Sequence, residues 1–114
     1  MKNQGFYEYV VTEVVPANLG IIGRKMFGGY GLYKNGLCFA LITSGKLFFK
    51  VNETNRMDYE QYGSKPFQFA KKNGMVMLTS YWEVPADIIE DREAIVTWIE
   101  KSVAVAQAAK QRKK

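Results

Sequence analysis

The sequence has 114 residues, of which 47% are hydrophobic and 24% are charged, and this fits one globular domain. It contains no histidine and one cysteine, Cys38, which excludes Ser-His and Cys-His nucleophile pairs, His-ligated zinc sites and an internal disulfide. No stretch approaches the roughly 18 apolar residues of a membrane-spanning helix, and the N-terminus is too polar for a signal peptide. A lone thiol also suits a reducing compartment, so we expect a cytoplasmic protein.

The positive charge is concentrated at the C-terminus. The net charge is +5, and the last five residues, "KQRKK", carry four cations, so the rest of the chain is nearly neutral. A basic tail can bind nucleic acid, but it can equally be a solvated helix end that the helix dipole favours. We expect one domain over residues 1–109, followed by a frayed basic tail over residues 110–114.

The first half of the chain predicts a helix followed by three strands. Residues 4–15 place apolar side chains at helical spacing. From residue 24 the hydrophobic period falls to two, which predicts an extended segment over residues 24–33 and strands over residues 37–42 and 46–51. The intervening "KNG" and "TSGK" are turn signals, so these strands should form an antiparallel meander.

The second half predicts a short helix, two strands and a long helix. Residues 54–63 suit the short helix, and "KPFQFA" suits a brief strand at a sheet edge because of its proline. Residues 75–84 form the longest strand pattern, which Pro85 ends. Asp91 can cap a final helix that carries one apolar stripe to about residue 109.

The predicted order is therefore helix, three strands, helix, two strands, helix. This order predicts an α+β fold in which an antiparallel sheet of about five strands packs against helices. On the strand at residues 46–51, Leu47, Phe49 and Val51 alternate with Lys46, Phe48 and Lys50. Neither face of that strand is purely polar, so the sheet face away from the helices can still require a partner.

The stretch "RKMFGGYGLY", residues 24–33, resembles a phosphate-binding loop in its glycine content alone. It lacks the Walker A spacing and the G-x-G-x-x-G spacing, and it leads into a strand instead of a helix N-terminus. Glycines within strands allow a bulge, a sharp bend or close backbone approach. We therefore expect these glycines to serve backbone geometry.

Cations and aromatic side chains mark one candidate binding surface. Lys46, Phe48 and Lys50 share a strand face, and a neighbouring strand can add further members. A cationic, aromatic sheet face can bind single-stranded nucleic acid by stacking and phosphate contacts, although the same residues also suit ordinary sheet packing. The full candidate set for nucleic-acid or partner binding is Arg24, Lys25, Tyr30, Lys46, Phe48 and Lys50.

Catalytic chemistry has little support in the sequence. A small enzyme that uses Glu83 with Tyr81 or Lys50 is the least supported of the hypotheses. The simpler interpretation of Glu83 is a charge at the end of a strand that reaches solvent. No group of residues has the spacing of an EF-hand or a His-based metal site. We therefore expect no catalytic residue, no metal and no cofactor.

Several motifs resemble the N-terminal domain of the TfoX/Sxy family. They are the run R-[RK]-M-F-G-G-x-G-[LI]-Y, then "GKLFFKV", "YGSKPFQF" and "YWEVPADIIED", in the same order from about residue 6 to residue 106. The signature positions, which we expect to be structural, are Met26, Phe27, Gly28, Gly29, Gly31, Tyr33, Tyr81, Glu83 and Pro85.

The resemblance implies an α+β fold with a long C-terminal helix and a role in regulating natural competence for DNA transformation. Members are thought to act as transcriptional coactivators with the cyclic-AMP receptor protein, and they are not established enzymes. Full-length regulators carry a second, helical domain, so this sequence is either an uncharacterised single-domain relative or a piece of a longer protein. We expect a regulatory interaction domain that binds a transcription factor or forms a homodimer, with direct nucleic-acid binding as the alternative.

Overall fold

A computed structural model describes residues 2–26 and 28–112. Helix α1 (Lys2–Tyr9) continues through a π-helical turn (Val10–Val14) and a 3₁₀ turn (Ala17–Leu19) into strands β1 (Ile22–Met26), β2 (Gly29–Lys34), β3 (Leu37–Thr43) and β4 (Lys46–Lys50). Helix α2 (Arg56–Glu60), strands β5 (Pro66–Lys71) and β6 (Gly74–Glu83), and helices α3 (Ala86–Ile89) and α4 (Arg92–Arg112) follow. The predicted α+β class and long C-terminal helix are confirmed.

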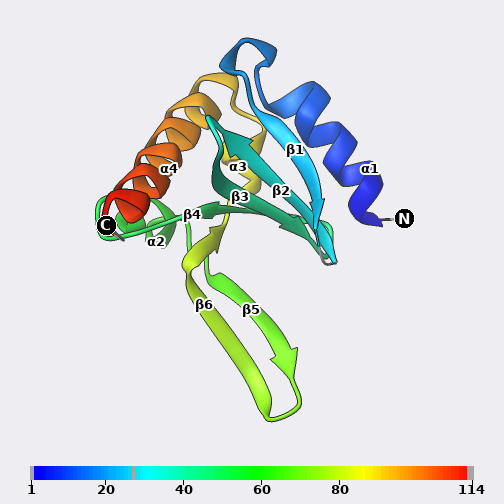
Figure 1. Ribbon diagram of the computed structural model, residues 1–114, viewed down its shortest axis with the longest axis vertical. Coiled ribbons are helices and arrows are strands. Elements are labelled where there is room, and N and C mark those ends of the chain that lie inside the picture. The colour runs from blue at the N-terminus through cyan, green and yellow to red at the C-terminus, as the bar shows by residue number, and fades with distance from the viewer. Residues whose placement is uncertain (1, 27, 113–114) are drawn as a thin grey trace.

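The six strands form one antiparallel sheet in the order β1-β2-β3-β4-β6-β5 (Figure 1). Helix α4 packs on β3 and β4, and α1 packs on β2 and β3. Both helices therefore lie over the central strands. The buried core between the helices and the sheet is made of Val10, Val14, Leu32, Phe39, Ala40, Ile42, Leu47, Phe49, Trp82, Ile95, Trp98 and Ile99, among others.

The sheet has six strands where the sequence pattern predicts about five, because residues 24–33 do not form one extended segment. The chain reverses between β1 and β2, and Gly28 takes the left-handed conformation with φ +69°. Glycine adopts this conformation without the steric cost that a Cβ imposes. Phe27, beside it, lies outside the described residues.

Two further glycines of the same stretch allow close approach across the strands. A Cβ on Gly29 would collide with the backbone carbonyl oxygen of Ile42 on β3, and a Cβ on Gly31 would collide with Met26 Sδ. The geometric interpretation of the glycine cluster therefore holds at three of its positions.

The C-terminal helix begins as the sequence predicts. Asp91 Oδ1 accepts hydrogen bonds from the backbone N–H groups of Glu93 at 3.1 Å and Ala94 at 3.0 Å, which caps the first turn of α4. The helix runs to Arg112, so residues 110–112 are helical instead of forming part of a frayed tail. Residues 113–114 lie outside the described residues.

The elements on either side of the β5–β6 hairpin differ from their predicted lengths. Helix α2 covers five residues, shorter than the predicted segment 54–63, although Gly63 does end it in the left-handed conformation with φ +71°. The sequence pattern does not predict α3, a single turn in which the N–H groups of Ile88 and Ile89 donate to the carbonyl of Pro85. Strand β5 lies at the sheet edge, as Pro66 predicts.

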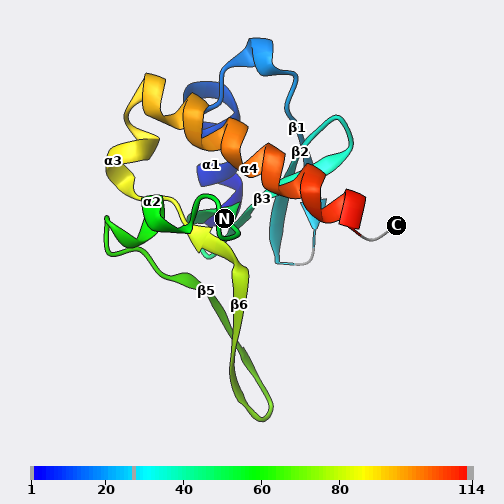
Figure 2. The ribbon, with the colours of Figure 1, turned by 90° about the vertical axis from the view of Figure 1, so that its left-hand side faces the viewer.

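The hairpin of β5 and β6 projects from the body of the molecule (Figures 1 and 2). Strand β6 pairs with β4 only at its C-terminal end, where Lys50 is opposite Tyr81 and Phe48 is opposite Glu83. We call residues 67–78, which lie beyond this pairing, the arm.

Candidate interaction surface

The sheet has one face that the helices leave uncovered. Residues opposite each other on neighbouring strands point to the same side, so the strand register assigns each side chain to a face. We call the uncovered side the open face, and its side chains are Ile22, Arg24, Met26, Tyr33, Cys38, Leu41, Thr43, Lys46, Phe48, Lys50, Tyr81 and Glu83.

The structure brings only four of the six predicted binding residues onto the open face. Arg24, Lys46 and Lys50 lie there with Phe48, whereas Lys25 and Tyr30 are opposite each other on the helix side of β1 and β2. The Tyr30 ring stacks on Tyr7 of α1 at 3.9 Å, with an angle of 7° between the ring planes. Tyr30 therefore packs helix against sheet and does not join the open face.

Phe48 is on the open face but is covered. It is only 6% exposed, and the ring of Phe67 lies 4.9 Å from it. A nucleobase cannot stack on a ring that another ring already covers. The sequence pattern located the side chain on the correct face, but it did not predict that the β5–β6 hairpin folds over it.

Two cation–aromatic pairs flank the one thiol of the chain. The Arg24 guanidinium lies 5.7 Å from the centre of the Tyr33 ring, and the Lys50 ammonium lies 5.5 Å from the centre of the Tyr81 ring. Between the rings, the Tyr81 hydroxyl donates to Cys38 Sγ at 3.9 Å. Tyr33 and Cys38 are close in sequence but Tyr81 is far from both, and the register of β2, β3, β4 and β6 brings the three together.

Both tyrosines of this group stay protonated well above neutral pH. Partial burial raises the pKa of Tyr33, and the Cys38 thiol adds to the increase while Arg24 opposes it. Burial also raises the pKa of Tyr81, with further contributions from Cys38 and Tyr33. With no ionised phenol between them, the Arg24 and Lys50 cations suit the carboxylate or phosphate groups of a ligand.

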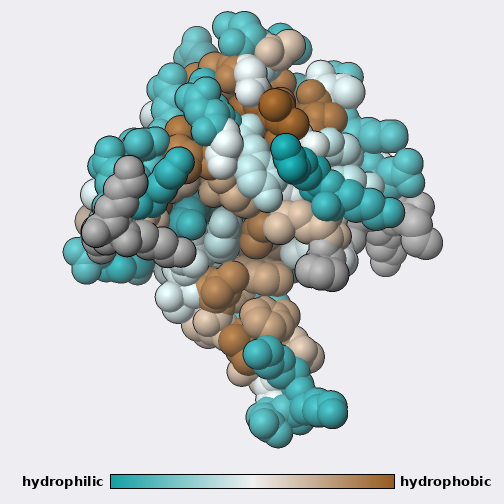
Figure 3. Space-filling view, in the orientation of Figure 1, coloured by the Kyte–Doolittle hydropathy of each residue, from teal (hydrophilic) through white to brown (hydrophobic). Residues whose placement is uncertain are grey.

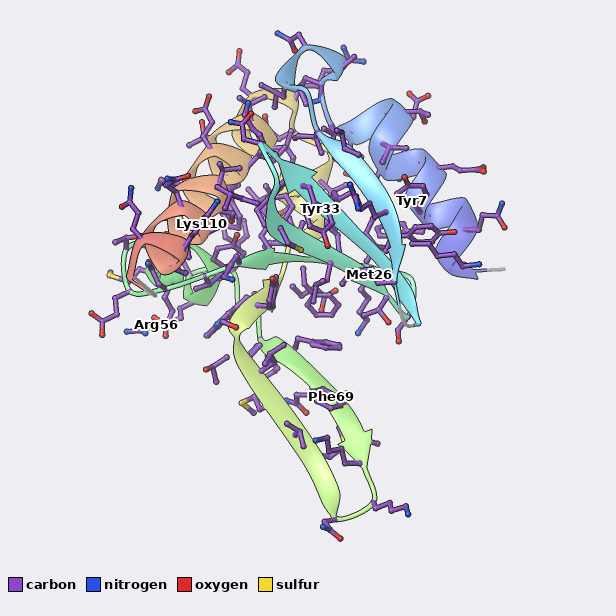
Figure 4. All side chains as sticks on the ribbon, in the orientation of Figure 1. Tyr7, Met26, Tyr33, Arg56, Phe69 and Lys110 are labelled. Carbon is purple, nitrogen blue, oxygen red and sulfur yellow. The ribbon has the colours of Figure 1, made fainter. Side chains whose placement is uncertain are left out.

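A shallow hollow extends this group toward the end of α4. It has a volume of about 240 Å³ and brings Lys110 close to Lys50 and Cys38 (Figure 4 labels Lys110 and Tyr33). The small side chains of Ala106 and Ala109 form its helical wall. Lys110 thus adds a second cation near Lys50 at this end of α4, while Arg24 lies beside Tyr33.

The other part of the open face is less charged. Lys46 and Glu83 form an ion pair at 3.9 Å, with side chains 55% and 42% exposed. A second hollow, of about 170 Å³, lies between Met26, Leu41 and Phe67. Met26 itself is 39% exposed, so this part offers apolar contact area.

Sequence reasoning missed Tyr33, Cys38 and Tyr81 as members of a surface. It assigned both tyrosines to the family signature and gave Cys38 no role. The available signal was the alternation on each strand, which puts Tyr81 and Glu83 on one side of β6 and Tyr33 on a defined side of β2. That signal cannot say which strands become neighbours.

Metal ligation and membrane insertion have no support among the described residues. Over residues 2–26 and 28–112, no group of three or more Cys, Asp or Glu side chains is placed to hold a metal ion. Within the same residues, no helix has the length and apolar character needed to cross a membrane.

Comparison with known proteins decides the family. A family model, the TfoX N-terminal domain, matches residues 18–106. The chain belongs to the TfoX N-terminal domain family. This match contains every strand and most of α4, so the sheet and its open face are parts of the family domain.

One curated relative agrees with this assignment. The chain is 30% identical over 71 residues to the DNA transformation protein TfoX1 of Aliivibrio fischeri (strain ATCC 700601 / ES114). The matched segment is 62% of this chain and 33% of the relative. The TfoX N-terminal domain described here thus spans about one third of that relative.

Several residues that we expected to be structural signature positions lie at turns and strand ends. Gly28 turns the chain between β1 and β2, and Gly31 gives room to the Met26 side chain. Pro85 follows β6 and precedes α3 with extended backbone. These residues build the hairpin and the strand end that form the rim of the open face.

Proposed function

We propose that the chain is a non-enzymatic interaction domain that takes part in regulating natural competence, and that it binds its protein partner on the open face. The family match over residues 18–106 is the observation that carries this proposal. The open face supports it because a sheet face with exposed apolar and cationic side chains suits a protein partner that brings apolar and acidic groups.

The finer proposal is coactivation of transcription together with the cyclic-AMP receptor protein, in the cytoplasm. A coactivator needs a docking surface and no catalytic group. The absence of histidine from the whole sequence, which removes the commonest general acid–base residue, is consistent with this role.

Two neighbouring cations on β1 give a matched test of the open face. Arg24 and Lys25 are both exposed, but Arg24 points to the open face and Lys25 to the helix side. We expect Arg24→Glu to lower transformation frequency in the native host about tenfold, equivalent to about 1.4 kcal/mol of binding free energy, while Lys25→Glu changes it less than about twofold. Immunoblots must show equal protein levels.

The same variants test binding to the proposed partner separately from the transformation phenotype. Purified cyclic-AMP receptor protein, loaded with cyclic AMP, should bind the native chain in a calorimetric titration and bind the Arg24→Glu variant more weakly. If both variants transform like the native chain, the open face is not the docking surface. If deletion of the gene leaves transformation unchanged, the competence role itself is wrong.

Direct nucleic-acid binding is the second candidate, and two observations favour it: Arg24 and Lys50 each lie over a tyrosine ring, and Lys110 lines a hollow with Lys50. Binding of a fluorescent single-stranded oligonucleotide should weaken steeply with salt, because each phosphate contact releases counterions. Replacing Lys46 and Lys50 with alanine and removing "KQRKK" should then reduce both the affinity and the salt slope. Unchanged anisotropy curves for that variant would exclude this candidate.

A further inference from the structure

Within residues 2–26 and 28–112, the arm is held to the rest of the molecule only at its base. Its strands pair with each other from Phe67 opposite Leu78 to Lys71 opposite Gly74. The β4–β6 pairing ends at Tyr81, and the ring of Phe67, the first residue of the arm, contacts the ring of Phe48 in the body. In both ribbon views the arm extends alone below the sheet (Figures 1 and 2).

The arm carries apolar side chains on both of its faces. Phe67, Phe69, Val76 and Leu78 share one face by register, and Met75 and Met77 lie on the other with exposed fractions of 65% and 53%. None of these side chains belongs to the buried core. Figure 3 shows apolar residues along the arm and a hydrophilic tip.

A two-stranded hairpin of this kind is only marginally stable in water, and it becomes stable when further strands or another layer join it. The outer side of β5 is a sheet edge, because among the described strands β5 pairs with β6 alone. Natural edge strands are usually protected by charges or proline. Here Pro66 and Lys71 stand at the ends of β5, and the segment Phe67–Gln68–Phe69–Ala70 between them carries no charge.

We propose that the arm is a dimerisation element, in which β5 pairs antiparallel with β5 of a second copy of this chain and Phe69 lies opposite Phe69 of that copy. The two sheets then continue into one another across a two-fold axis. This inference concerns the free edge of β5 and does not depend on the regulatory role proposed above.

The charges of the arm exclude one register of this pairing. Residues 64–82 contain Lys65, Lys71 and Lys72 and no acidic residue. A two-fold pairing that keeps the phenylalanine-bearing faces together must place one residue opposite itself. Centring the pairing on Gln68 puts Lys71 opposite Lys65 of the other copy, and like charges directly opposite each other are unfavourable.

Centring the pairing on Phe69 removes that repulsion. Phe69 then meets Phe69 of the second copy, and Lys71 lies opposite Phe67, where a cation–aromatic contact is favourable. Lys71 also arrives on the open-face side of the partner sheet, where Glu83 is 42% exposed and holds Lys46 only loosely at 3.9 Å. The second copy thus brings the Lys71 ammonium toward the exposed Glu83 carboxylate, whose ion pair with Lys46 is long.

Cysteine crosslinking tests the register directly. In a Cys38→Ala background, Phe69→Cys places two thiols opposite each other, with Cα atoms about 4.5–5.5 Å apart, which is within disulfide range. Copper–phenanthroline oxidation should convert most of this variant into a covalent dimer. The control Met77→Cys is on the same arm, but its two copies would be separated by three strand spacings, about 14 Å, so it should stay monomeric.

The oligomeric state gives a second, independent measurement. Light scattering coupled to gel filtration should give twice the monomer mass of 13.0 kDa for the native chain. Phe69→Lys should weaken the dimer about tenfold or more, because it removes the central aromatic pair and puts like charges at the axis, whereas Met77→Lys should weaken it less. Circular dichroism should show both variants folded, since neither residue is in the core.

Three outcomes would overturn the inference. They are a native chain that stays monomeric up to millimolar concentration, a dimer that Phe69→Lys leaves intact, and equal crosslinking at positions 69 and 77. A loss of nucleic-acid binding in Phe69→Lys without any change in mass would assign the arm to nucleic acid instead of to a second copy.

Discussion

At the scale of single residues, the glycines of "GGYG" have two different roles. One glycine provides a backbone conformation, and two provide room for a neighbouring atom. Gly28 supplies a positive φ, whereas Gly29 and Gly31 supply room for a neighbouring atom. The neighbour of Gly29 is a backbone carbonyl, which cannot move without breaking the β2–β3 register. The neighbour of Gly31 is the end of the flexible Met26 side chain, which can rotate away.

This difference predicts two unequal losses of stability. Gly29→Ala should lower the free energy of unfolding by about 3 kcal/mol or more, and Gly31→Ala by about 1 kcal/mol, because overpacking costs more where backbone must shift. Urea denaturation followed by tryptophan fluorescence measures both. Adding Met26→Ala to Gly31→Ala should recover part of the loss. Equal losses for the two glycine variants would contradict the assignment of Met26 as the neighbour that yields.

At the scale of elements, local signals were sufficient where the element depends on its own residues. The cap at Asp91, the stripe of α4 and the alternation of β4 all come from side chains within a few positions of one another, and each is confirmed. The prediction was wrong where a tertiary contact decided the outcome. Residues 24–33 suit one extended strand by period, but pairing of β1 with β2 requires the reversal at Gly28.

The arm is the element whose behaviour the sequence describes least. Both of its strands and the turn between them are predictable from "KPFQFA", "KNG" and "MVMLTSYWEV". The hairpin leaves the sheet because its pairing is irregular at Pro66. Pro66 lies opposite Trp82, whereas the next residue, Phe67, lies opposite Leu78. That shift leaves β6 residues 79–81 opposite no residue of β5, and the hairpin separates from the body there.

At the scale of the whole molecule, Tyr59 joins three elements. It lies on α2, is 1% exposed, and contacts the rings of Trp82 on β6 and Trp98 on α4, at 6.4 and 4.4 Å. Burial raises the pKa of its hydroxyl, more than the neighbouring Ser102 hydroxyl lowers it. The folded chain therefore holds this proton at a pH where the unfolded chain has lost it.

This linkage predicts a loss of stability at high pH. Because the folded-state pKa lies above the unfolded value near 10, the stabilisation is complete below pH 10 and decreases as the pH rises above it. From pH 9 to pH 11 the free energy of unfolding should fall by about 1.4 kcal/mol through Tyr59 alone. Urea titrations at each pH should show a smaller fall in Tyr59→Phe than in the native chain, whereas Tyr62→Phe, at a 49% exposed position, should behave as native.

The sequence by itself determined the α+β class, the long C-terminal helix, the alternation of side chains along β4 and the family, because hydrophobic period, capping and turn chemistry act between residues close in the chain. Only the tertiary structure decided that Tyr33, Cys38 and Tyr81 meet, that Lys25 and Tyr30 lie on the helix side, and that Phe67 covers Phe48. These outcomes depend on which strands become neighbours and in what register. Register is set by packing between residues tens of positions apart, and no local pattern contains it.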